Sequence, residues 1–211
     1  MDQNRNSMKM INEQLIFLPG ASGSTDFWQP LIQQLPDEYE KRVIAYAGFG
    51  QTPVDPTIHN FAQLQSVVLQ KIDQPSILIA QSMGGIFAIA AALQKPELIK
   101  GLVLIATSGG VDLQPFHVAD WREAYQKEFL NYPDWFVTAQ TRYDDLLQFI
   151  QIPVLLIWGD QDDISPIAVG EYLLEQLPQA TLKVIKGGNH QLANGYATEV
   201  AHDILQYLQS L

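Results

Sequence analysis

Short apolar runs alternate with longer helical patterns along most of the chain. The first run is QLIFL at residues 14–18, and Pro19 and Gly20 end it. Five further runs, each expected to be a buried strand, lie at residues 42–46, 76–80, 102–106, 154–158 and 182–185. Apolar positions with helical spacing predict helices at residues 27–35, 61–72, 83–93, 167–177 and 198–208. Continuous apolar strands separated by helices favour an α/β fold, with a mostly parallel sheet of about six strands covered by helices on both faces.

The length of 211 residues is that of one ordinary domain, so we expect a single domain over residues 1–211. Residues 109–151 interrupt the alternation and are helical and irregular in character. Residues 1–10 are polar and are expected to form a flexible tail. The chain starts without the apolar stretch of a secretory signal and has no window long enough to span a membrane. We therefore expect a cytoplasmic location and no membrane partner.

Composition removes several kinds of chemistry. The chain has no cysteine, which excludes disulfides, thiolate zinc sites, iron–sulfur clusters and cysteine nucleophiles. It has 12 Lys and Arg against 23 Asp and Glu, a net charge of −11, so it repels phosphate backbones. We therefore expect no nucleic-acid partner, and the function expected below needs no metal site and no cofactor.

The most informative segment is SILIAQSMGG at residues 76–85, where a buried strand runs directly into a buried helix. Ser82 lies at this junction, with the small residues Ala80 and Gly84 two positions to either side. Such a sharp turn exposes the hydroxyl at the carboxyl edge of a sheet, beside a helix N-terminus. Alternatively, Ser82 is an ordinary N-cap that bonds a free backbone N–H, and these five residues alone leave both interpretations open.

With its partners, the segment resembles the α/β-hydrolase superfamily, and specifically its small cytosolic serine esterases, over about residues 14–211. That family has the order nucleophile, acid, histidine. The segment GDQDDISP at 159–166 resembles its acid loop, which implies Asp162 as the acid, although Asp160 and Asp163 share the loop. The segment GGNHQL at 187–192 resembles its histidine loop. The resemblance implies Ser82 as nucleophile, His190 as base and Asp162 as the residue that orients the imidazole.

The resemblance also implies two backbone N–H groups for the negative oxygen of the intermediate, those of Ala21 and Met83. Residues 18–24, LPGASGS, align with the family's His-Gly-x-x-Gly-Ser, and Pro19 takes the place of its histidine. Since the donor is backbone, we expect this oxyanion hole to survive the change.

Residues 109–151 lie where the family carries a cap over its active site, and they hold nine of the chain's aromatic residues. These side chains either pack the cap onto the core or form an apolar wall above Ser82, and a small cap needs both. The candidates for the substrate pocket are Phe49, Phe116, Trp121, Trp135 and Phe136.

The expected function is a cofactor-free serine hydrolase of small carboxylic esters that works through an acyl-enzyme. A thioesterase would use the same residues. Another alternative is a lyase or carbon–carbon hydrolase of the same fold, which binds polyanionic substrates with inward arginines. The segment 109–151 has only three basic residues, which makes this alternative weaker. A ligand-binding protein is the alternative outside enzymes, and the Ser82, Asp162 and His190 set argues against it. The substrate expected is a small ester or thioester, and the sequence indicates no oligomeric state.

Overall fold

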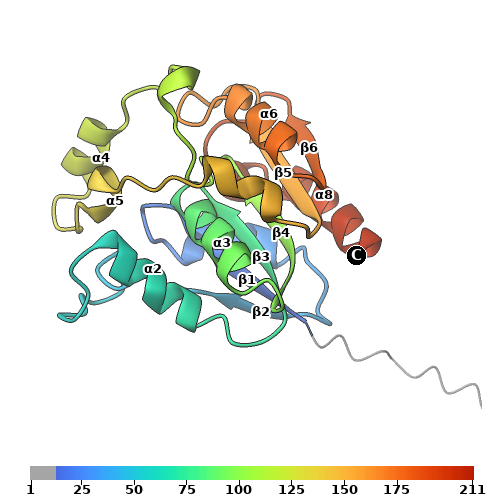
Figure 1. The fold of residues 1–211 in the computed structure, drawn as a ribbon, viewed down its shortest axis with the longest axis horizontal. Coiled ribbons are helices and arrows are strands. Elements are labelled where there is room, and N and C mark those ends of the chain that lie inside the picture. The colour runs from blue at the N-terminus through green and yellow to red at the C-terminus, as the bar shows by residue number, and fades with distance from the viewer. Residues whose placement is uncertain (1–12) are drawn as a thin grey trace, which may run out of the picture.

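A computed structural model describes residues 13–211, so the tail expected at 1–10 lies outside the described residues. The described chain forms a six-stranded sheet in the order β2-β1-β3-β4-β5-β6 in which every neighbouring pair is parallel (Figure 1). Its strands are β1 (Gln14–Leu18), β2 (Glu40–Val43), β3 (Ser76–Gln81), β4 (Ile99–Ile105), β5 (Val154–Gly159) and β6 (Ala180–Ile185). The predicted parallel sheet is therefore confirmed.

Helices cover both faces of this sheet (Figure 1). One face carries α2 (Phe61–Gln70), α3 (Met83–Gln94) and α6 (Ile167–Gln176). The other carries α1 (Gln29–Ile32), α7 (Leu192–Gly195) and α8 (Ala197–Ser210), with the short 3-10 helix η1 (Asp26–Trp28). Four short helices lie between β4 and β5, namely η2 (Gln114–Phe116), α4 (Arg122–Glu128), α5 (Trp135–Thr138) and η3 (Asp144–Phe149).

The two helical layers create two cores, and β1 contributes to both. Ile16 and Leu18 belong to the core beneath α2, α3 and α6, whereas Leu15 and Phe17 belong to the core beneath α1 and α8. Successive side chains of a strand point to opposite faces. Because both faces are covered, the strand is apolar throughout, as a parallel sheet between helices requires.

Three predicted elements have bounds that are wrong by three residues. The strand expected at 102–106 is β4, which begins at Ile99 because Lys100 and Gly101, ahead of the apolar run, also belong to it. The second strand, expected at 42–46, pairs with β1 from Glu40 to Val43 instead. Beyond it, Tyr46 turns into the core and its hydroxyl donates to the Pro19 carbonyl. The helix expected at 27–35 is divided between η1 and α1, with Pro30 in the first turn of α1, where its missing N–H costs no hydrogen bond.

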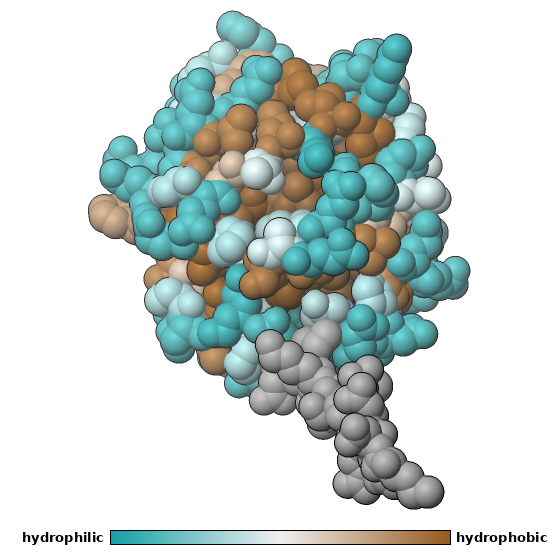
Figure 2. Space-filling view, turned by 90° about the vertical axis from the view of Figure 1, so that its right-hand side faces the viewer, coloured by the Kyte–Doolittle hydropathy of each residue, from teal (hydrophilic) through white to brown (hydrophobic). Residues whose placement is uncertain are grey.

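The surface carries apolar side chains as well as polar ones. Figure 2 shows apolar residues between hydrophilic ones on one face of the molecule. The exposed large apolar side chains lie on separate elements, such as Phe149 in η3 and Val184 in β6. Such scattered exposure is ordinary for a folded chain and marks no site by itself. Within residues 13–211, no helix combines the length and apolar character that crossing a membrane requires.

Candidate active site

Ser82 occupies a strained turn between β3 and α3. Its backbone angles are φ 53° and ψ −122°, and its N–H donates to the Ile105 carbonyl of the neighbouring strand at 3.1 Å. A positive φ in a residue other than glycine costs about 1–3 kcal/mol and persists only where the surroundings impose it. The Ser82 side chain makes no capping hydrogen bond to α3. The alternative that Ser82 is an ordinary N-cap is therefore wrong.

Small residues make this turn possible because the start of α3 lies directly against the end of β1. A Cβ atom at Gly84 would overlap the carbonyl oxygen of Leu18, and one at Gly85 would overlap the side chain of Thr107. Gly20, in the loop after β1, lies so close to Ser82 that a Cβ there would be 3.3 Å from the Ser82 Cβ. The glycines thus let the loop after β1 lie beside the serine.

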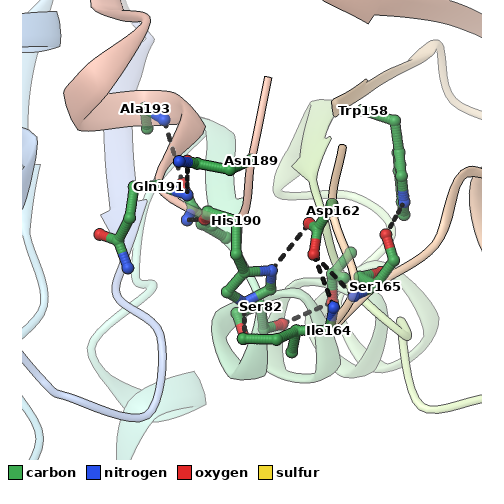
Figure 3. Close-up of polar contacts among 11 residues, drawn as sticks. Ser82, Trp158, Asp162, Ile164, Ser165, Asn189, His190, Gln191 and Ala193 are labelled. Atoms are coloured by element: carbon green, nitrogen blue, oxygen red, sulfur yellow. Dashed lines mark hydrogen bonds and ion pairs between the residues drawn. The ribbon is translucent and has the colours of Figure 1, made fainter. Parts of the chain in front are cut away.

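His190 and Asp162 complete a row of hydrogen bonds that begins at Ser82 (Figure 3). His190 Nε2 lies 3.1 Å from Ser82 Oγ, and His190 Nδ1 lies 2.8 Å from Asp162 Oδ2. The Asp162 side chain is completely shielded from solvent, and its Oδ1 accepts hydrogen bonds from the Ile164 and Ser165 N–H groups, each at 2.9 Å. These bonds fix the direction of the carboxylate.

The acid loop contains three aspartates, and the structure brings only one of them to His190. Asp160 Oδ1 instead accepts a hydrogen bond from the Gly187 N–H at 2.6 Å. Asp163 is exposed. Of the three, Asp162 is the one that contacts His190, and its role as the acid stays a prediction.

This arrangement can move a proton away from Ser82. An ionised carboxylate only accepts hydrogen bonds, so the His190 nitrogen that faces Asp162, Nδ1, carries the hydrogen. Nε2 then has a free lone pair directed at the Ser82 hydroxyl and can accept its proton. Loss of this proton would make Ser82 Oγ a nucleophile.

A cavity of about 480 Å³ opens above Ser82 and His190. One wall is apolar and comes mainly from residues between β4 and β5, namely Leu113, Trp121, Tyr125, Phe129 and Phe136. Ala21 and Met83, expected to supply backbone N–H groups to an oxyanion, also line it. An apolar pocket with a few polar groups, here beside the half-buried Ser82, is typical of small-molecule sites.

Two of the five aromatic pocket candidates, Trp121 and Phe136, lie in this wall, and the other three do not line the cavity. Phe49 is fully buried in the core, with Tyr46 against one edge and Tyr132 and Trp135 against others. Phe116 packs on Tyr172 of α6. These three rings attach the segment 109–151 and its neighbours to the core.

The charge in the cavity is sparse and negative. Among the described residues that line it, Glu128 and His190 carry the ionisable carboxylate and imidazole, and none is a lysine or arginine. Burial is the main cause that raises the pKa of the Tyr125 phenol, so this hydroxyl stays protonated and can donate. Among residues 13–211, no three His, Asp or Glu side chains are grouped so that they could hold a metal ion.

The sequence analysis missed two residues, Gln81 and Thr107, that form hydrogen bonds with the backbone of His190 and Ser82. The Gln81 amide donates to the His190 carbonyl at 2.6 Å and accepts from the Ala193 N–H at 3.2 Å, so it ties β3 to the histidine loop. The Thr107 hydroxyl donates to the Ser82 carbonyl. Each is a polar residue at the end of an apolar run, and both are buried. Because buried polar groups need hydrogen-bond partners, this position was the one signal in the sequence that could have identified them.

Comparison with known proteins shows the family. The model of the α/β hydrolase fold family matches residues 14–139, more than half of the chain, so the protein belongs to that family. An uncharacterised hydrolase of Bacillus subtilis, YugF, is 25% identical over 244 aligned residues, which cover 92% of this chain and 89% of that protein.

Two more distant similarities concern esterases. A pimeloyl-[acyl-carrier protein] methyl ester esterase of Neisseria meningitidis serogroup A is 24% identical over 232 residues, 89% of this chain and 74% of that protein. The crystal structure of a thermophilic esterase from Thermogutta terrifontis superposes with a TM-score of 0.67 at 19% identity, over 94% of this chain and 89% of that one. The structural likeness concerns the fold alone.

Proposed function

We propose that the protein is a serine hydrolase that cleaves small carboxylic esters through an acyl-enzyme. The observation that carries the proposal is the row of hydrogen bonds from Ser82 through His190 to Asp162 beside the cavity. The positive φ of Ser82 adds support, because strained backbone conformations cluster at active sites, where the surrounding structure imposes them.

The reaction follows from these positions. Ser82 Oγ attacks the ester carbonyl as His190 Nε2 takes its proton, and the carbonyl oxygen becomes negative. In the proposal the N–H groups of Ala21 and Met83 bind this oxygen. The tetrahedral adduct then expels the alcohol, which receives the proton from His190 and leaves an acyl group on Ser82. Water, activated by the same histidine, releases the acid and restores the serine.

The cavity favours an ester with an uncharged, apolar part. The aromatic wall of Trp121, Tyr125, Phe129 and Phe136 offers contact to an acyl chain or an aromatic group. Among the described residues, no lysine or arginine lines the cavity to hold a carboxylate or phosphate, which weighs against the lyases and carbon–carbon hydrolases that bind polyanions. In this proposal the segment 109–151 is the cap of the active site.

The test is labelling by a fluorophosphonate probe together with turnover of p-nitrophenyl esters of graded acyl length and of the matching thioesters. We expect labelling at Ser82 and a loss of more than about 10³-fold in kcat for Ser82→Ala. Ser108→Ala is the matched control, since Ser108 also lines the cavity but is not bonded to His190. A folded protein that is not labelled, or a Ser82→Ala variant that keeps most of its turnover, would contradict the proposal. The ratio of ester to thioester turnover decides between esterase and thioesterase.

A further inference from the structure

Two tyrosine hydroxyls from distant parts of the fold hold the loop after β1. Tyr46 donates to the Pro19 carbonyl and Tyr125 donates to the Ala21 carbonyl, each at 2.9 Å. We propose that Tyr46 and Tyr125 are positioning residues, which fix this loop so that the Ala21 N–H stays directed at the oxyanion. The inference rests on the proposed function, because it concerns the same reaction.

The hydrogen bonds of the loop account for three successive carbonyls. Between the two that the tyrosines bind, the Gly20 carbonyl accepts from the Gly23 N–H at 3.0 Å. A trans peptide is planar, and its C=O and N–H point in opposite directions. The bond at the Gly20 carbonyl therefore sets the direction of the Ala21 N–H, and the tyrosines fix the peptide units on either side.

Residues 19–21 cannot supply these bonds from their own side chains, and the Ser22 and Ser24 hydroxyls of the same loop accept from the Ser24 and Phe27 N–H groups. Pro19 has no backbone N–H and no polar side chain, and Gly20 and Ala21 have no polar side chain either. Glycine also has the widest backbone freedom of any residue. A loop of this composition needs partners from outside to keep one conformation, and the two hydroxyls provide them.

The two tyrosines come from different parts of the molecule, Tyr46 from the core and Tyr125 from the segment between β4 and β5. Tyr46 is fully buried, and its ring packs on Phe49 and Phe87 in the core. Tyr125 lies in α4, beside the cavity, and its ring packs on Trp121 and Phe129. Burial raises the pKa of both phenols, so both hydroxyls keep their hydrogen and can donate at neutral pH. Tyr125 thus links the position of α4 to the oxyanion donor.

The first experiment compares Tyr125→Phe with Tyr132→Phe in the hydrolysis of p-nitrophenyl acetate and p-nitrophenyl hexanoate. Tyr132 lies in the same segment and also packs on Phe129, but its hydroxyl makes no hydrogen bond with another described residue. One hydrogen bond contributes about 0.5–1.5 kcal/mol, so we expect kcat of Tyr125→Phe to fall about threefold to tenfold. KM should change less than about twofold, and the loss should be equal for both esters. Tyr132→Phe should match the wild type.

A trifluoromethyl ketone inhibitor provides a second readout, because its adduct with Ser82 carries the negative oxygen. Its inhibition constant for Tyr125→Phe should rise by the same factor by which kcat falls. If kcat and this constant both stay within twofold of the wild type, the inference is wrong. A loss that appears in KM and grows with acyl length also overturns it, because Tyr125 would then be a substrate contact.

Amide hydrogen exchange of residues 18–24 tests the same idea without turnover. The loop should exchange faster in Tyr125→Phe and in Tyr46→Phe than in the wild type and in Tyr132→Phe. Unchanged exchange overturns the bracing role. If the wild type hydrolyses no ester but the loop exchanges faster in the two variants, the proposed function is rejected while the tyrosines still fix the loop. The failure of the inference and the failure of the proposed function are therefore distinguishable.

Discussion

Asparagine at position 162 has nearly the same shape as aspartate, but the hydrogen bonds around this side chain determine which nitrogen of His190 carries the hydrogen in the Asp162→Asn variant. Oδ1 of Asp162 accepts from the Ile164 and Ser165 N–H groups, so an asparagine must place its single oxygen there. Its NH₂ group then faces His190 Nδ1, which has to accept. The imidazole hydrogen moves to Nε2, where it points at the Ser82 hydroxyl, and the histidine cannot take the serine proton.

The alternative rotamer explains why the effect should be large. Turning the amide would restore the productive histidine tautomer, but it would set NH₂ against the N–H groups of Ile164 and Ser165, of which the second is buried. An unsatisfied buried donor costs about 1–3 kcal/mol, so the Ser165 N–H alone gives about 1–3 kcal/mol against this rotamer. The corresponding aspartate-to-asparagine change in a serine protease lowers kcat about 10⁴-fold. We expect a similar fall in kcat for Asp162→Asn.

The assay is kcat for a p-nitrophenyl ester, with thermal unfolding measured in parallel. Because asparagine keeps both N–H bonds at Oδ1, a loss of about 1–2 kcal/mol in stability is expected, which lowers Tm by about 2–8 °C. Asp160→Asn and Asp163→Asn are the controls, since neither side chain contacts His190, and kcat should stay within about tenfold of the wild type. A fall of less than about tenfold for Asp162→Asn, or an equal fall for Asp160→Asn, would refute the reasoning.

Two further predictions concern packing and charge. Gly84→Ala forces α3 away from the Leu18 carbonyl, so we expect the free energy of unfolding to fall by about 1–3 kcal/mol, measured by Tm, and kcat to fall strongly. Gly195→Ala, with open space around its Cβ, should change neither Tm nor kcat. A Gly84→Ala variant as stable and active as the wild type would show that the tight turn is not required. Glu128→Gln should raise kcat/KM for the p-nitrophenyl monoester of adipic acid about twofold to fivefold over that for p-nitrophenyl hexanoate, because one repulsive charge is removed. Glu123→Gln, on the same helix but paired with Lys127, should leave this ratio unchanged, and an equal gain in both variants would make the effect one of net charge.

The fold could be predicted where strands are buried on both faces. Residues 14–18 and 76–80 were located to within one residue, because a strand between two helical layers is apolar along its whole length. Strands with polar residues at their start were less predictable, including β4 inside the sheet, which begins at Ile99 and contains the exposed Lys100. β2 begins with Glu40, Lys41 and Arg42, and an edge strand pairs through its backbone even where its side chains reach solvent. An apolar run therefore marks its position with an error of two or three residues.

The proposed site divides in the same way between local and distant information. Ser82, Asp162 and His190 each follow the carboxyl end of a strand in a short recognisable segment, so local sequence indicated all three. The bond between Tyr125 and Ala21 joins residues 104 positions apart, and no local pattern identifies a hydroxyl that reaches a carbonyl at such a distance. Gln81 stands next to Ser82, yet its partners His190 and Ala193 lie more than 100 residues away.

The aromatic segment shows what spacing adds once a helix is known. Trp121, Ala124, Tyr125 and Glu128 all line the cavity, and steps of three or four residues place them on one face of α4 and its first turn. This helix is only seven residues long, so its sequence alone carries a weak periodic signal. The same face holds the ring that forms the wall, the hydroxyl that reaches the Ala21 carbonyl, and the carboxylate in the cavity. A shift of α4 must therefore change the shape of the cavity, its charge and the position of the proposed oxyanion donor together.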